Sequence, residues 1–76
     1  MQNLTSMQVA AIGYIIAQGA DKGRAVAVPP SVATLGYHTE LTALCNKQTL
    51  FVIGWISYTI CHCGGTKFSL HEVKDA

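Results

Sequence analysis

The sequence has few charged residues. Only five of its 76 residues are Lys or Arg and four are Asp or Glu, which is 12% of the chain and a net charge of +1. Half of the residues are hydrophobic, and this composition excludes an intrinsically disordered chain. The near-neutral balance disfavours strong attraction to phosphates, since dedicated nucleic-acid binders are far more basic. So few charges leave apolar area on the surface, which favours a homodimer or a protein partner.

The sequence also lacks targeting and membrane signals. Its N-terminus has no positively charged stretch of the kind that opens a signal peptide. The longest uncharged stretch, residues 48–66, is densely apolar only in its first part, which is too short to cross a bilayer. An odd number of cysteines without a secretory signal argues against a disulfide framework. We therefore predict a cytoplasmic protein that does not associate with membranes.

The length predicts a single domain over residues 1–76, with frayed ends at 1–3 and 74–76. A chain this short buries only about 60% of the surface that its unfolded form exposes.

No catalytic or metal-binding signature is present. The one suggestive cluster is Cys61-His62-Cys63. In the predicted sheet His62 faces away from both cysteines, and His71 lies about 13 Å from Cys61 at roughly 3.3 Å per residue, too far to share one zinc ion. A reactive thiol would also need a nearby base. We interpret the cysteines, Cys45 included, as small apolar side chains, and expect no metal, cofactor, enzyme activity or small-molecule substrate.

Residues 6–18 carry strong helix signals. Thr5 and Gln8 fit the capping box, in which each side chain bonds the backbone amide of the other residue. Gly19 suits the left-handed residue that ends a helix. The predicted buried stripe consists of Val9, Ile12, Ile15 and Ile16.

The middle of the chain predicts short elements. Residues 21–23 form a turn, and 24–28 a possible short strand. Pro29-Pro30 excludes both ladder pairing and a helix through that point, so a short helix over about 30–35 would begin there and end at Gly36. Residues 38–48 form the next predicted helix, whose buried stripe is Leu41, Leu44 and Cys45.

The C-terminal third predicts a β-hairpin of one long strand from Leu50 to Cys61 and a second strand ending near Val73. One face of the first strand would carry Leu50, Val52, Ile56, Tyr58 and Ile60, and the other face Phe51, Ile53 and Trp55. A two-residue Gly64-Gly65 turn would mix apolar and polar residues on both faces. A three-residue loop, 63–65, pairs Ile60 with Phe68 and gives one apolar face, so we predict that register.

This order of elements resembles a winged helix-turn-helix domain. The segments that carry the resemblance are LTSMQVAAIGYIIAQG for the first helix, VATLGYHTELTAL for the helix-turn-helix, and GGTKFSLHEV for the wing and last strand. The resemblance covers about residues 4–73. It implies an α+β fold in which three helices pack on a C-terminal hairpin, with a possible short third strand.

The resemblance also implies duplex DNA as a partner and a role in transcription regulation, with the third helix in the major groove and the wing on the backbone. Carried over by position, the groove-facing residues would be Tyr37, His38, Thr39, Glu40, Thr42, Ala43, Asn46 and Lys47, and the wing would span His62 to Lys67. Lys22, Arg24, Lys47 and Lys67 could each contact a phosphate.

The alternative prediction is a degenerate winged helix that binds protein. Phe51, Ile53 and Trp55 would form an apolar row of the kind that anchors interfaces, including a homodimer contact. A free-standing chain of this size could be an inhibitor or adaptor encoded by a phage or another mobile element.

Overall fold

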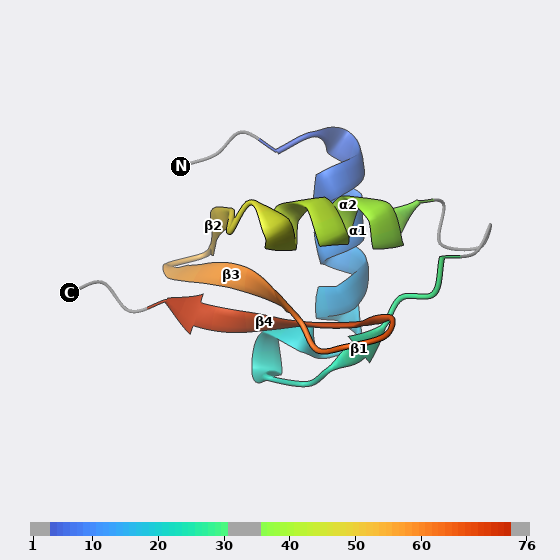
Figure 1. Ribbon diagram of the computed structural model, residues 1–76. Helices are drawn as coiled ribbons and strands as arrows, with labels where there is room; N and C mark the ends of the chain where they lie inside the picture. Colours follow the sequence, from blue (N-terminus) through green and yellow to red (C-terminus); the bar gives the residue numbers. More distant parts are fainter. Residues whose placement is uncertain (1–3, 31–35, 74–76) are drawn as a thin grey trace.

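A computed structural model describes residues 4–30 and 36–73, and within them two α-helices and a 3-10 turn accompany a four-stranded antiparallel sheet (Figure 1). The elements are α1 (Ser6–Ala17), η1 (Ala20–Lys22), β1 (Val26–Ala27), α2 (Tyr37–Asn46), β2 (Leu50–Ile53), β3 (Ile56–His62) and β4 (Lys67–Val73). The order across the sheet is β1-β4-β3-β2.

The predicted architecture of three helices packed on a hairpin is therefore wrong, although the chain is α+β. Its sheet has four strands because the expected first strand divides in two and the short segment after η1 joins β4. The short helix expected over 30–35 falls on residues outside the described ones, apart from Pro30.

Helix α1 matches its prediction to within one residue. The Thr5 amide donates to Gln8 Oε1 at 3.0 Å, and the Gln8 amide donates to Thr5 Oγ1 at 3.1 Å, so the capping box is complete. Gly19 takes a left-handed φ of 99° just after the helix. The buried stripe differs from the expected one, because Val9 is 56% exposed and Ala11 is fully buried with Ile15.

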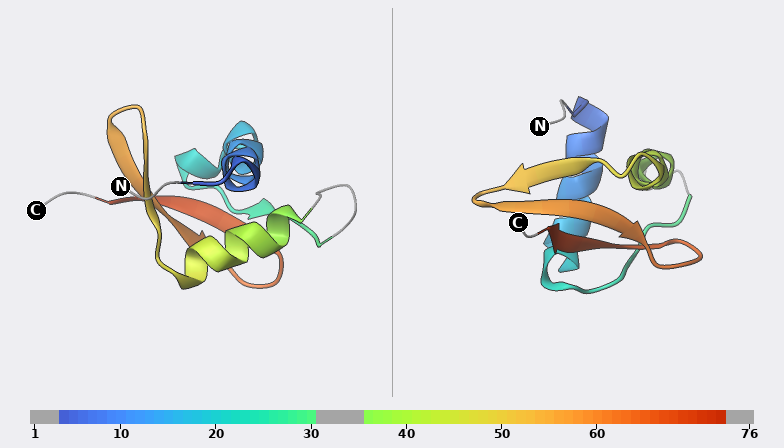
Figure 2. Two further views of the ribbon diagram at one scale, coloured as in Figure 1. Left: turned by 90° about the horizontal axis from the view of Figure 1, so that it is seen from above. Right: turned by 60° about the vertical axis from the view of Figure 1, so that its left-hand side comes forward.

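Helix α2 begins after Gly36 and ends earlier than expected. Gln48, expected inside the helix, has a φ of 53°, a left-handed conformation that a continuing α-helix does not allow. Leu41 and Leu44 are buried as predicted, while Cys45 is half-buried. Figures 1 and 2 show α1 crossing behind the strands and α2 running beside β3.

The long strand predicted from residue 50 to 61 is interrupted by a two-residue turn at Gly54-Trp55. Ile53 pairs with Ile56 across this turn, and Gly54 has the positive φ, 62°, that the first central residue of a type II′ turn requires. The chain reverses here, so Phe51 pairs with Tyr58 and both rings face the core, stacked at 6.3 Å. The prediction that Phe51 and Tyr58 lie on opposite faces is wrong.

Strands β3 and β4 meet in a register shifted by two residues from the expected one. Ile60 pairs with Leu70 and His62 with Phe68, whereas the prediction paired Ile60 with Phe68. A shift of two residues keeps every side chain on its face, since side chains alternate with a period of two. The predicted apolar face is therefore confirmed for Tyr58, Ile60, Phe68 and Leu70, whereas the predicted pairing is wrong. Leu50, Val52 and Ile56, predicted on the same face, are exposed.

One hydrophobic core joins the helices to this face of the sheet. Its buried members are Ala11, Ile12, Ile15, Ala20, Val26, Val28, Leu41, Leu44, Phe51, Tyr58, Ile60, Phe68 and Leu70. The other face of the sheet carries mainly small and polar side chains from β3 and β4. Neither described helix has the length and apolarity needed to cross a membrane.

Candidate functional site

The residues predicted to read DNA from α2 divide into exposed and packed groups. Thr39, Asn46 and Lys47 are exposed, whereas Tyr37 is half-buried and lies 5.6 Å from the ring of Tyr14. Thr42 and Ala43 are also half-buried, and the Thr42 hydroxyl donates to the His38 carbonyl at 2.8 Å. Much of the face expected to enter a DNA groove is therefore occupied by contacts within the protein.

His38 and His62 are structural in this fold. His38 Nδ1 donates to the Val28 carbonyl at 2.9 Å, and His62 Nε2 donates to the Gly65 carbonyl at 2.7 Å, because a carbonyl oxygen can only accept. Both rings contact Phe68, with centroids 5.5 and 4.8 Å away. The predicted wing residue His62 therefore ties the β3–β4 loop to the core.

The predicted phosphate contacts come from separate parts of the molecule. Lys67 begins β4 opposite Ala27, and Arg24 packs its side chain over Gly19 near η1. Lys47 follows α2. His38, near the opposite end of this helix, contacts His62 at the end of β3, and nine residues of helix separate His38 from Lys47 by roughly 13 Å. The structure therefore places Lys47 away from the strand end that carries Lys67, and Lys22 is exposed in η1.

The apolar row predicted from Phe51, Ile53 and Trp55 does not form. Phe51 is buried, Ile53 is half-buried, and Trp55 is 100% exposed at the tip of the β2–β3 hairpin. Trp55 is thus the one member of the row that is fully available to a partner.

An apolar groove of about 290 Å³ lies between α1 and β2, close in the chain to Trp55. We call the groove and Trp55 together the apolar surface; its groove residues are Leu4, Val9, Ile12, Gly13, Ile16, Phe51, Val52 and Ile53. No charged residue belongs to it. The sequence carried one signal for it: the twelve residues of α1, SMQVAAIGYIIA, contain no charged side chain.

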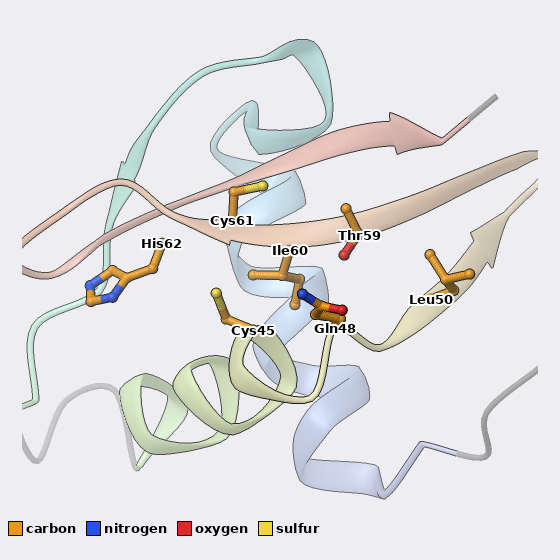
Figure 3. Close-up of a pocket in the computed structure, with 7 residues that line it drawn as sticks. All are labelled: Cys45, Gln48, Leu50, Thr59, Ile60, Cys61 and His62. Carbon is orange, nitrogen blue, oxygen red and sulfur yellow. The ribbon is translucent and has the colours of Figure 1, made fainter.

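A second, more open hollow of about 620 Å³ lies between the end of α2 and the edge of β3 (Figure 3). It is lined by Cys45, Gln48, Leu50, Thr59, Ile60, Cys61 and His62. Pairing of β2 with β3 ends at Thr59, which leaves this edge of β3 beside α2.

Cys61, one of the two cysteines at this hollow, has the character of an inert thiol. Burial raises the pKa of the Cys61 thiol, and the neighbouring Cys45 and Cys63 raise it further. A protonated thiol is a poor nucleophile and a poor metal ligand. Across residues 4–30 and 36–73, no group of three or more His, Cys, Asp or Glu side chains converges in a way that could hold a metal ion.

No family model, curated protein or solved structure matches the chain. The resemblance to the winged-helix family stays a prediction, and any function has to be argued from the geometry above.

Proposed function

We propose that this chain acts by binding protein, and that the partner its apolar surface fits is a second copy of itself. The observation that carries the proposal is that the fully exposed Trp55 follows, by two residues, Ile53 of an apolar groove in the same chain. A solvated indole leaves about 150–250 Å² of ring surface to be buried on association. Tryptophan side chains that fill apolar pockets are common anchors of protein interfaces.

A two-fold dimer would bury both the exposed Trp55 and the apolar groove, since each copy would insert Trp55 into the groove of the other. The two indoles would contribute about 300–500 Å² of the roughly 1,200 Å² that a specific interface buries. Val9 and Val52, which line the groove and are 56% and 43% exposed, supply further area.

Charge does not oppose this association. The groove residues and Trp55 are uncharged, and the net charge of the chain is only +1. Two copies can therefore approach without strong mutual repulsion. DNA binding gains no comparable support, because Lys47 lies apart from Lys67. We place the protein in the cytoplasm, in keeping with its three unpaired cysteines.

Trp55 is the only tryptophan, so its fluorescence reports directly on the contact. We expect the emission to shift to shorter wavelength as the concentration rises from about 1 µM to about 1 mM. Val52→Lys places a charge in the groove and should abolish the shift. Thr39→Lys, which adds the same charge on the exposed side of α2, should retain it.

Emission typical of a solvated indole at every concentration would refute self-association. If the shift then occurred only on addition of a different protein, protein binding would stand with another partner.

A further inference from the structure

A thiol, a hydroxyl and an imidazole form a continuous chain of contacts on the sheet face that points away from the core. Cys63 Sγ lies 3.1 Å from Ser69 Oγ, and Ser69 Oγ lies 3.2 Å from His71 Nε2. Ser69 is only 3% exposed, whereas Cys63 and His71 are both exposed. A buried hydroxyl thus links an accessible nucleophile to an accessible base.

The register of β3 and β4 brings these groups together. Ser69 and His71 are two residues apart on β4 and therefore project from the same face. Ser69 pairs with Cys61, and the Cys63 amide donates to the Lys67 carbonyl at 2.8 Å, which continues the ladder by one step. Cys63 therefore lies diagonally across from Ser69, within side-chain reach.

The three groups can pass a proton from sulfur to nitrogen. The Ser69 hydroxyl can accept the thiol proton of Cys63 while it donates its own proton to Nε2 of His71. The S–H bond breaks, Ser69 exchanges one proton for another, and an N–H bond forms on the imidazole. The products are a thiolate and an imidazolium, and the Ser69 hydroxyl then donates to the sulfur.

We propose that Cys63 is a reactive thiol, activated by His71 through Ser69, that exchanges with small disulfides such as glutathione disulfide. The thiolate attacks one sulfur of the disulfide, whose S–S bond breaks as the bond to Cys63 forms. The released thiolate leaves with the electron pair and takes up a proton from the imidazolium or from water. The small disulfide is the oxidant, and the product is a mixed disulfide at the start of the β3–β4 loop.

Cys61 is an internal comparison for this reactivity. It lies within β3, two residues before Cys63, but it is half-buried and burial raises the pKa of its thiol. It lines the hollow beside α2 with Cys45. The proposal therefore predicts modification of Cys63 in preference to the other two cysteines.

The test uses full-length chains that keep one cysteine each, with the others changed to Ser. Mass spectrometry should show that Cys63 forms the glutathione adduct at least about tenfold faster than Cys61 at pH 7. In the Cys63-only chain, Ser69→Ala and His71→Asn should each slow the reaction about tenfold, as expected for loss of a proton acceptor. Circular dichroism confirms that each variant is folded.

A pH profile separates a proton acceptor from a merely structural residue. The rates of the His71→Asn variant and its parent should converge near pH 10, where hydroxide can take the place of His71 as proton acceptor. The other ionisable side chains of β4 and of the elements around His71 remain in place in this variant; they are Tyr58, Cys61, His62, Cys63, Lys67, Glu72, Asp21 and Lys22.

His62→Gln is the matched control, since His62 adjoins Cys63 in sequence but bonds to Gly65 and stacks on Phe68. It should leave the rate within about twofold at pH 7. Equal rates for Cys63 and Cys61, or unchanged rates in both the Ser69→Ala and His71→Asn variants, would overturn the proposal.

Discussion

At the scale of single residues, two aromatic side chains lie at opposite extremes of burial. Phe68 is fully buried and contacts the rings of His38 and His62, whereas Trp55 is fully exposed. We expect Phe68→Ala to lower the free energy of unfolding by about 3–5 kcal/mol, because it leaves a cavity in the core. Trp55→Ala should change it by less than about 0.5 kcal/mol in dilute solution. Urea denaturation at low protein concentration measures both, and similar losses would contradict the assigned packing.

The Cys61 thiol makes stability depend on pH at the alkaline end. Burial raises its pKa in the folded protein above the ordinary value of 9.0, so the folded state keeps this proton where the unfolded state releases it. The stability that depends on the protonated Cys61 thiol is fully present below pH 9.0 and is lost as the pH rises through the higher pKa of the folded state. Wild type should therefore lose more stability between about pH 8 and 10 than Cys61→Ser does. Denaturation of wild type and Cys61→Ser at both pH values measures this. An equal loss of stability in the two chains would disprove it.

At the scale of elements, the start of α1 depends on its capping box. Thr5→Ala removes the acceptor for the Gln8 amide and should cost about 1 kcal/mol of folding stability. Ser6→Ala, one residue further on, serves as the control because Thr5 is the residue whose side chain caps the helix. Thermal or urea unfolding measures the difference. An equal effect of the two substitutions would show that the cap does not contribute.

Substitution by Ala should raise the folding stability at Gly13 and lower it at Gly54. Gly13 lies within α1, where its φ is not positive and an added methyl group meets open space, so Gly13→Ala should stabilise the fold by about 0.5–1 kcal/mol. Gly54 has a φ of 62° in the β2–β3 turn, so Gly54→Ala should destabilise it by about 1 kcal/mol or more. If Gly54→Ala unfolded no more easily than wild type, the turn would not have the described conformation.

The sequence predicts a helix or strand well when the residues that specify its ends lie within a few positions of each other. It does not predict which side chains face the core when an unrecognised turn reverses the chain. Helix α1 was predictable because Thr5, Gln8 and Gly19 specify its ends within a few residues. The Gly54-Trp55 turn was missed because apolar, β-favouring residues continue on both sides of it. With the turn, Phe51 pairs with Tyr58 and both side chains face the core. A strand without the turn would place them on opposite faces, which is what the prediction assumed.

The candidate sites could not be predicted from the sequence either, because they depend on how the strands pair and pack. The apolar surface could not be derived without knowing that β2 lies beside α1. The link from Cys63 to Ser69 and His71 needed the true register, because the predicted pairing placed Ser69 opposite Thr59 instead of Cys61. Trp55 was predicted as an interface residue within a row that does not form, and the structure leaves it fully exposed.

At the scale of the whole molecule, the distribution of charge predicts weak interaction with DNA. The exposed cations come from the end of α2 (Lys47), the start of β4 (Lys67) and the segment around η1 (Lys22 and Arg24). We expect no tight binding of a random duplex at about 50 mM salt, measured by fluorescence anisotropy. Tight binding that weakens by several hundred-fold or more at about 200 mM salt would contradict this and favour the DNA-binding prediction.

The central claim is that the apolar surface joins two copies through Trp55, and sedimentation equilibrium tests it most directly. The wild-type mass should rise with concentration from 8.1 kDa toward twice that value, while Trp55→Ala should stay at the mass of one chain. Because Trp55 is fully exposed, the substitution should leave the fold intact, which circular dichroism can verify. A wild-type chain that stays monomeric, or a Trp55→Ala variant that associates equally well, would contradict the account.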